Sequence, residues 1–490
     1  MCFECMMDDF KTDTLQKRKK GKRPLLERPG LYTDYYELAM AQGYVLDGRA
    51  EETACFDYFF RKNPFEGGYV IFAGLADLFE ILSNFTFHDE ELQYLENEGF
   101  KPEFIDYLRN FELEVSVDSA REGEVIFPLE PVLRVTGPLP QVQLLETLTL
   151  NILNFESLIA TKAMRLKDAA GDRRVLDFGL RRAQGLGGIS ASRAAVIGGV
   201  EATSNVYSAH AYDLPASGTM AHSWIQSFED ELSAFRKFAE LYPEDCVLLV
   251  DTYDTLESGV PNAIKVAKEL EEKGHRLKGI RLDSGDLAYF AKKSRQQLDR
   301  AGLDYVKIAA SNQLDERLIR SLLSQNAPID LFGVGTRLVT GHESPALDGV
   351  YKLASVHGEP KLKLSENIEK VTLPGHKKVL RYINGNNKFY GDGILLEEEK
   401  DAKQIFHPYY PDRRFDTSGM DTEPLLHRIM EQGRLKMTAR SAEESAAYAR
   451  SRFAQLNPEH KRFENPHIYK VGISNRLMKL RDELRESAKK

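Results

Sequence analysis

One short stretch, residues 214–224 (LPASGTMAHSW), combines residue types that can handle an anion. Its Ser217, Gly218 and Thr219 offer hydroxyls and exposed backbone N–H groups, which together can cradle an anion. His222 follows shortly after, and a histidine beside such a nest can act as a general base, a metal ligand or a nucleophile toward a phosphoryl group. Taken by itself, a single histidine near Ser and Thr is more often structural. Whether His222 is structural or functional therefore depends on the segments on either side of this stretch.

A repeating pattern surrounds this stretch. Short apolar runs that end in polar residues alternate with amphipathic helical segments roughly every thirty residues, the length of one β/α unit. Nearly continuous apolar runs such as VLLV are typical of strands buried on both faces. In a (β/α) barrel the C-terminal ends of all strands open onto one face, where the active site lies. The residues that we expect to converge there are Arg181, Arg182, Asp251, Asp283, Ser311, Asn312 and Thr336. Asp286 and Gly335 lie in two of the same strand-end stretches. The stretch around His222 is expected to form a loop over the same mouth.

The residues at this predicted mouth suit two kinds of ligand. Arginines, Thr336 and the glycines of FGVGT suit phosphates, and loops after the last barrel strands often form a phosphate site. Asp283 and Asp286 suit Mg²⁺ or ribose hydroxyls, because Mg²⁺ favours one or two carboxylates together with substrate phosphates. The set fits a sugar phosphate that carries a pyrophosphate. The alternative for RLDSGD is a strand-end turn in which Asp283 caps the next helix.

The predicted barrel region, residues 173–348, lies between two regions with other patterns, so the fold class is α/β with α+β. Residues 31–172 predict an N-terminal α+β sandwich domain. Its first helix begins after Thr33 or Asp34, with Leu38, Met40 and Tyr44 at helical spacing, and ends at Gly48. The further elements expected in it are a strand ending at residues 60–61, an apolar helix after Gly67 and Gly68, helices over 89–98 and 102–111, antiparallel strands over 113–137 and a helical link over 142–170. Residues 349–490 predict strands that join the N-terminal domain, followed by helices.

Length and composition bound the kind of protein. A chain of 490 residues predicts two or three domains, and 42% hydrophobic with 29% charged residues is ordinary for a globular protein. A net charge of -9 excludes a general nucleic-acid binder. Four cysteines are too few for a disulfide framework, and we interpret the Cys2/Cys5 pair as free thiols in a tail. Residues 1–30, with the basic run KRKKGKR, predict a disordered tail. Without a recognisable secretion signal or membrane span, the expected location is cytoplasmic.

The chain resembles the nicotinate phosphoribosyltransferase family from about residue 31 to the C-terminus. The stretches that carry the resemblance are LYTDYYELAMAQGY, FFRKNPFEGGY, FGLRRAQG, ASGTMAHSW, DTYDT, RLDSGDLAY, ASNQLDE, FGVGT and GVYKL. Each is moderately specific, and together in this order they are highly specific. The resemblance implies a type II phosphoribosyltransferase fold, in which the barrel is irregular.

The resemblance also implies the reaction and its participants. Nicotinate and 5-phosphoribosyl-1-pyrophosphate give nicotinate mononucleotide and pyrophosphate, coupled to ATP hydrolysis, within NAD biosynthesis. His222 matches the histidine that ATP phosphorylates transiently, and Mg²⁺ is the expected metal. Tyr36 matches a tyrosine that stacks on the nicotinate ring across a dimer interface, so the resemblance implies a homodimer with shared active sites.

Further site residues follow from the same motifs. Thr219 and Arg281 match positions that hold the nicotinate ring and carboxylate, and a guanidinium can pair bidentately with a planar carboxylate. Thr336 matches a contact to the phosphoribosyl phosphate. Arg181 and Arg182 line the same site, and Asp283 can face the ribose.

Four other readings compete with this one. The nicotinamide-using relative shares the fold and the phosphoribosyl chemistry, and Arg281 does not exclude it. Quinolinate phosphoribosyltransferase is usually much shorter and needs no phosphohistidine. A non-catalytic metabolite-binding protein on the same scaffold would be expected to lack His222 or the aspartates. A barrel aldolase would need a strand-end lysine for a Schiff base, where this chain offers Asp, Arg and Ser.

Overall fold

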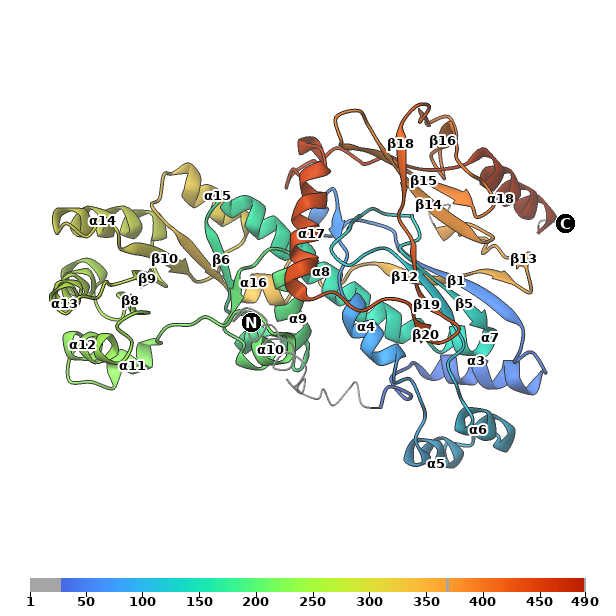
Figure 1. Cartoon of the computed structure of the whole chain (residues 1–490), viewed down its shortest axis with the longest axis horizontal. Helices are drawn as coiled ribbons and strands as arrows, with labels where there is room; N and C mark the ends of the chain where they lie inside the picture. The colour runs from blue at the N-terminus through green and yellow to red at the C-terminus, as the bar shows by residue number, and fades with distance from the viewer. Residues whose placement is uncertain (1–27, 367–369, 489–490) are drawn as a thin grey trace, which may run out of the picture.

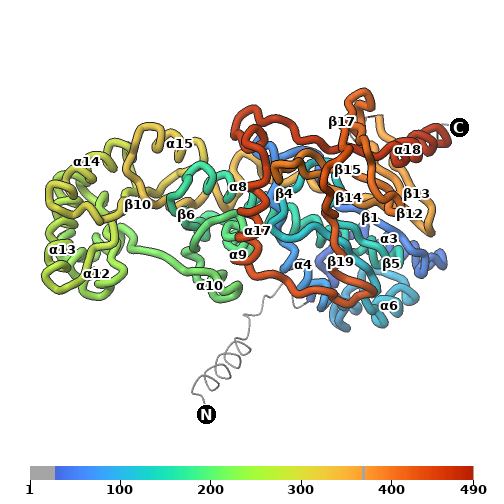
Figure 2. Tube along the Cα trace, turned by 45° about the horizontal axis from the view of Figure 1, so that its top comes forward, coloured from blue at the N-terminus to red at the C-terminus, as the bar shows by residue number. Residues whose placement is uncertain are grey.

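The computed structural model describes residues 28–366 and 370–488, in two bodies that lie side by side (Figure 1). The predicted tail with Cys2, Cys5 and KRKKGKR falls almost entirely outside the described residues. The smaller body holds the β/α repeats, and the larger one combines segments from both ends of the described chain, which Figure 2 shows as blue and red tubes beside each other. The 25-residue helix α8 (Glu146–Ala170) contacts elements of both bodies.

The β/α repeats form one parallel sheet of six strands in the order β7-β6-β11-β10-β9-β8. The strands are β6 (Arg174–Asp177), β7 (Ala202–Thr203), β8 (Val247–Leu249), β9 (Gly279–Leu282), β10 (Lys307–Ser311) and β11 (Leu331–Val334). The helices that accompany them are α9 (Gly187–Ile197), α10 (Val206–Tyr212), α11 (His222–Gln226), α12 (Glu231–Leu241), α13 (Val260–Glu272), α14 (Leu287–Arg300), α15 (Glu316–Ser324) and α16 (Thr336–Val339). The sequence pattern missed β7, because two residues make no apolar run.

The segment after α10 extends the curled sheet beyond β7. Thr203 in β7 forms a parallel bridge with Ala216, and its backbone N–H donates to the Pro215 carbonyl at 3.0 Å. The backbone N–H of Ser217 in turn donates to the Thr203 carbonyl at 3.0 Å. The sheet is therefore an irregular barrel, and residues 217–219 form part of its wall rather than a free loop.

The larger body is built on a seven-stranded antiparallel sheet in the order β13-β12-β1-β5-β3-β19-β20. Its strands are β1 (Thr53–Phe60), β3 (Ser116–Ser119), β5 (Leu133–Pro138), β12 (Gly349–Val356), β13 (Glu359–Pro360), β19 (His427–Glu431) and β20 (Arg434–Leu435). Strands from beyond residue 349 thus join the N-terminal sheet, as expected. A two-stranded sheet, β2 (Val70–Ile71) with β4 (Val125–Ile126), lies in the same body.

The expectation for the C-terminal strands is wrong in one respect. A further six strands make a separate sheet in the order β17-β16-β21-β15-β14-β18. They are β14 (Lys377–Ile383), β15 (Phe389–Leu396), β16 (Gln404–Phe406), β17 (Arg414–Asp416), β18 (Asp421–Pro424) and β21 (Val471–Ile473). Buried charges connect this sheet to the rest. Arg381 in β14 pairs with Asp392 at 2.7 Å and with Glu124, next to β4, at 2.6 Å.

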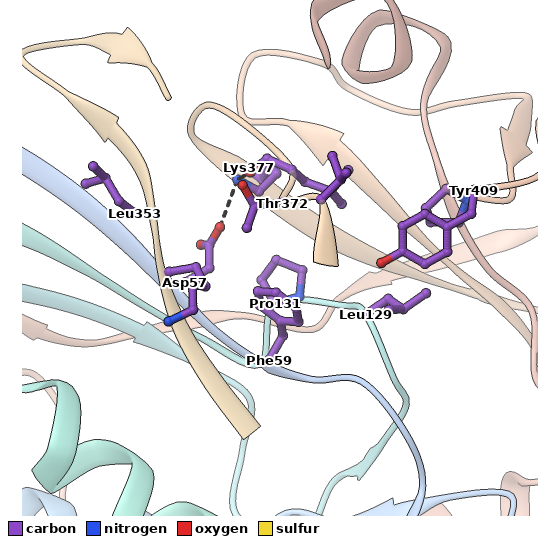
Figure 3. A pocket seen from close by; sticks show the side chains of 12 residues that line it. Asp57, Phe59, Leu129, Pro131, Leu353, Thr372, Lys377 and Tyr409 are labelled. Atoms are coloured by element: carbon purple, nitrogen blue, oxygen red, sulfur yellow. Dashed lines mark hydrogen bonds and ion pairs between the residues drawn. The ribbon is translucent and has the colours of Figure 1, made fainter. Parts of the chain in front are cut away.

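A second buried ion pair joins the two large sheets (Figure 3). The Lys377 Nζ lies 2.8 Å from the Asp57 Oδ2, and both side chains are at most 5% exposed. The small cavity beside them has a volume of about 20 Å³, which is enough for one water molecule and too little for a substrate. We therefore interpret the residues around this cavity as a structural contact between the two sheets and not as a binding site.

The helices of the larger body largely follow the sequence pattern. They are α3 (Tyr35–Leu46), α4 (Leu75–Leu82), α5 (Asp89–Asn97), α6 (Pro102–Arg109), α7 (Leu139–Gln143), α17 (Ala442–Gln455) and α18 (Asn475–Ser487). α3 begins after Asp34, as predicted, but Met40 is 39% exposed rather than packed. The predicted helical link is two helices, α7 and α8. Among the described residues, no helix is long and apolar enough to cross a membrane.

Candidate active site

Arg281 on β9 forms the centre of the predicted mouth. Its Nε donates to the Ser311 Oγ at 2.9 Å, and its Nη1 donates to the Thr219 Oγ1 at 3.2 Å. Its Nη2 donates to the Asp283 Oδ1 at 3.0 Å. These partners come from β10, from the segment after α10 and from the end of β9, and they fix a side chain that is only 16% exposed. The structure therefore brings Asp283 and Ser311, which the strand-end pattern predicts to converge, together with Thr219 and Arg281, which the family motifs single out.

An aromatic ring that the sequence analysis did not single out lies beside this guanidinium. The Phe178 ring centroid is 5.3 Å from the Arg281 Cζ. Phe178 directly follows β6 and lies against Gly333 of β11, where a Cβ atom would come within 2.4 Å of the ring. The glycine thus makes room for the ring inside the sheet. The only sequence signal was the aromatic residue in the strand-end motif FGLRRAQG.

His222 is the first residue of α11, at the edge of the same mouth. Its Nδ1 lies 3.0 Å from the Thr252 Oγ1, and its Nε2 lies 3.9 Å from the Asp283 Oδ2. The side chain is 38% exposed, so Nε2 is accessible to a ligand. Thr252, in the motif DTYDT, was not among the predicted site residues, and the structure identifies it as the hydrogen-bond partner of the imidazole.

Asp251 shapes the turn that carries Asp283. Its Oδ2 accepts hydrogen bonds from the Asp283 backbone N–H and from the Ser284 Oγ, both at 2.7 Å. Its Oδ1 is buried and has no hydrogen-bond partner within the part of the chain that the structure describes. A buried carboxylate oxygen normally has a partner. Asp251 is thus placed to position the turn and to offer one oxygen to a ligand.

The structure corrects the alternative reading of RLDSGD. Asp286, not Asp283, caps α14, because its Oδ1 accepts from the Tyr289 backbone N–H at 3.0 Å. Asp283 instead accepts from Arg281 and from the Ser311 hydroxyl. The described residues contain no cluster of three or more His, Cys, Asp or Glu that could hold a metal. Asp283 Oδ2 and Asp251 Oδ1 still fit Mg²⁺, which needs few protein ligands when substrate phosphates supply the others.

The predicted phosphate-binding residues occupy neighbouring strand ends. Arg181 and Arg182 lie in a short 3₁₀ turn after β6 and are exposed. Gly335 and Thr336 follow β11, the strand that pairs with β6. Asn312, after β10, adopts a left-handed φ of 85° and is exposed. Exposed arginines and a glycine turn thus lie together at the C-terminal ends of neighbouring parallel strands. This arrangement suits an anionic ligand that is larger than a single carboxylate bound by Arg281.

A cavity of about 700 Å³, a volume typical of a small-molecule site, lies beside Arg281 and its partners Thr219 and Ser311. Its lining includes Phe178, Ser217, Gly218, Thr219, Arg281 and Ser311. A guanidinium beside an aromatic ring and hydroxyls suits a flat aromatic carboxylate.

Tyr36 is not brought to this cavity within one chain. It lies on α3 in the larger body, away from β8, β9 and β10 (Figure 1), and is 45% exposed. Partial burial and the charges of Glu146 and Glu37 raise the pKa of its hydroxyl.

Comparisons with known proteins point to one family. The profile of the nicotinate phosphoribosyltransferase N-terminal domain matches residues 31–154, that of the family matches residues 173–404, and that of the C-terminal domain matches residues 376–481. Nicotinate phosphoribosyltransferase of Bacillus subtilis (strain 168) is 45% identical over 455 residues, which cover 91% of this chain and 92% of that protein. The human enzyme of the same name is 35% identical over 529 residues, covering 95% and 97%.

A solved structure shows the same similarity. The crystal structure of human nicotinic acid phosphoribosyltransferase matches with a TM-score of 0.82 at 34% identity, and the match covers 92% of this chain and 99% of that one. The similarity extends over both bodies, so it includes the sheet that carries the candidate site.

Proposed function

This chain belongs to the nicotinate phosphoribosyltransferase family, and from that premise we propose that it couples nicotinate mononucleotide synthesis to ATP hydrolysis through His222. The proposed substrates are nicotinate, 5-phosphoribosyl-1-pyrophosphate and ATP, and the proposed place is NAD salvage in the cytoplasm. The observation that carries the proposal is the Arg281 guanidinium, held by three side chains beside Phe178 in a cavity of suitable size.

Nicotinate fits the inner part of the cavity. Its carboxylate would pair with Arg281 and Thr219, and one face of its ring would lie against Phe178. A charged hydrogen bond is roughly twice as strong as a neutral one, so the acid should bind better than the amide. This charge preference separates the proposal from the nicotinamide-using alternative.

The phosphoribosyl substrate fits the outer part of the mouth. Arg181, Arg182, Gly335 and Thr336 are the proposed phosphate contacts, and Ser311 and Asn312 are further proposed contacts to this substrate. Asp283 would face the ribose, where it stabilises positive charge that develops at C1 as the bond to pyrophosphate breaks and the bond to the ring nitrogen forms. Mg²⁺, with Asp283 and either Asp251 or Asp286 as protein ligands, would neutralise charge on the departing pyrophosphate.

His222 is the proposed phosphoryl acceptor. If Nδ1 donates its hydrogen to the Thr252 hydroxyl, Nε2 keeps its lone pair for the γ-phosphorus of ATP. A bond from Nε2 to phosphorus then forms, the bond from phosphorus to the ADP oxygen breaks, and ADP leaves. The new phosphate adds negative charge beside the mouth and can order the segment that carries Thr219.

A homodimer completes the proposed site. Tyr36 is exposed on α3 and lies away from its own barrel, so it can stack on nicotinate only in a partner's site. Two-fold pairing would place the same contact in both sites of the dimer.

The test is to incubate the protein with phosphoribosyl pyrophosphate, Mg²⁺ and ATP, and to offer nicotinate or nicotinamide. Nicotinate mononucleotide should form, faster with ATP than without it, and acid-labile phosphate should appear on the protein. His222→Ala should lose both the label and the ATP stimulation. The absence of product from nicotinate would refute the proposal, and faster turnover of nicotinamide would favour the rival activity.

A further inference from the structure

The cavity at Arg281 continues through the barrel. Large branched side chains normally fill the interior of a (β/α) barrel. Here Ala309, in the middle of the central strand β10, is only half-buried. The same cavity is lined by exposed residues at both ends of the strands: Thr219 at the C-terminal end, and Lys278 and Lys307 at the N-terminal end. The hollow therefore reaches solvent at both ends of the strands.

We name the second opening the N-terminal opening, and it is lined by Arg174, Val247, Lys278, Lys307 and Leu331. The cavity wall as a whole has four cationic side chains, Arg174, Lys278, Arg281 and Lys307, and two carboxylates, Asp245 and Asp330. Lys278 pairs with Asp245, and Lys307 pairs with Asp330 at 3.2 Å. The excess positive charge and the apolar wall between the two ends suit a small aromatic anion.

Bound phosphoribosyl pyrophosphate would affect the two openings of the cavity differently. The residues that suit phosphates stand at the C-terminal mouth, whereas Arg281 is only 16% exposed and lies further inside. On the proposed function, phosphoribosyl pyrophosphate bound at this mouth would lie between solvent and Arg281. Nicotinate could then reach the guanidinium only from the other side.

We propose that the N-terminal opening is a second entrance to the Arg281 site, through which a small aromatic carboxylate enters while phosphoribosyl pyrophosphate occupies the C-terminal mouth. This inference rests on the proposed function. It assigns a role to the N-terminal part of the hollow and to Lys278 and Lys307, none of which the proposed chemistry uses.

Val247→Phe tests the entrance. Val247 begins β8 opposite Gly279, two residues before Arg281 on β9, so the new ring would fill the passage about 7 Å along the strands from Arg281. Val247→Ala is the matched control, because it leaves the passage open. Initial rates are measured at limiting nicotinate while phosphoribosyl pyrophosphate is raised far above its KM.

In the wild type and in Val247→Ala, the rate should reach a plateau. In Val247→Phe, kcat/KM for nicotinate should fall about fivefold or more, because one entrance remains. High phosphoribosyl pyrophosphate should now inhibit, because both substrates compete for that entrance, while kcat at saturating nicotinate stays near the wild-type value. A folded Val247→Phe protein with unchanged kcat/KM and no such inhibition would overturn the inference. So would inhibition already present in the wild type.

A second variant tests the charges without filling the passage. Lys278→Gln with Lys307→Gln should lower kcat/KM for nicotinate at low salt, and the difference should shrink as salt screens the charges. An unchanged kcat/KM at low salt would count against entry on this side. A wild-type protein that forms no nicotinate mononucleotide would refute the proposed function as well, a result distinct from any difference between variants.

Discussion

The Nδ1 of His222, the first residue of α11, lies 3.0 Å from the Oγ1 of Thr252. A residue just after strand β8 thus orients an imidazole that the chain supplies from an earlier helix. Thr252→Val keeps the shape of the side chain and removes the hydroxyl. Losing one hydrogen bond of about 1 kcal/mol should lower the rate of His222 phosphorylation by about fivefold. Thr252→Ser, which keeps the hydroxyl, is the control.

The measurement for Thr252→Val is the rate of protein labelling by γ-labelled ATP, with turnover in the absence of ATP measured in parallel. Turnover without ATP should change little, because Thr252 makes no contact with Arg281 among its described hydrogen bonds. A labelling rate equal to wild type would show that the contact does not orient the imidazole.

Gly333→Ala should move the Phe178 ring without replacing Arg281 or Asp283. A Cβ at position 333 would lie 2.4 Å from a ring carbon of Phe178, so the ring must shift away from its place beside Arg281. The KM for nicotinate should rise by about tenfold. An aromatic contact of about 1 kcal/mol with the nicotinate ring is lost, and the shifted ring also disturbs Arg281, the proposed partner of the nicotinate carboxylate.

The KM for phosphoribosyl pyrophosphate should remain close to wild type in Gly333→Ala. Phe178→Leu provides the comparison, since it removes the ring directly. If Gly333→Ala folds and binds nicotinate normally, the ring does not form a wall of the nicotinate site.

Mixed dimers test whether Tyr36 completes a partner's site. Tyr36→Ala and His222→Ala should each be impaired as homodimers. After the two proteins are mixed, unfolded and refolded together, heterodimers should contain one intact site, because Tyr36 of one chain and His222 of the other meet there. The ATP-stimulated activity should recover to about a quarter of wild type at equal mixing. Recovery should be absent if each chain supplies its own tyrosine.

Glu130 should make stability depend on pH. It is fully buried, its Oε1 accepts from the Phe127 backbone N–H at 2.9 Å, and burial together with Asp392 raises its pKa well above the ordinary 4.5. The folded protein therefore keeps a proton that the unfolded chain releases above pH 4.5. Its contribution to stability is fully present below that pH and is lost as the pH rises toward the raised value.

Glu130→Gln imitates the protonated carboxyl and cannot ionise. Its Tm should exceed the wild-type Tm by an amount that grows from pH 5 to pH 8. Glu98→Gln, on the exposed end of α5, should change Tm little at either pH. A difference between Glu130→Gln and wild type that stays constant with pH would contradict the raised pKa.

The sequence determined the order of the elements and most of the site. The β/α repeats, the barrel-mouth position of Asp283 and Ser311, and the start of α3 after Asp34 all follow from local patterns, because periodicity and strand-end chemistry involve residues near one another in the chain. Arg281 came to the site only through the family motifs. The family motifs added the identity of the anions, which no local pattern specifies.

Only the tertiary structure decided how distant segments meet. Phe178 lies beside Arg281 because β6 and β11 are neighbours and position 333 has no side chain. The cap of α14 is Asp286 because Arg281 and Ser311 hold Asp283. The hollow behind Arg281 depends on which strand faces are turned inward, and the strands after residue 376 form their own sheet. Each depends on contacts across tens to hundreds of residues, and such contacts are fixed by packing rather than by spacing.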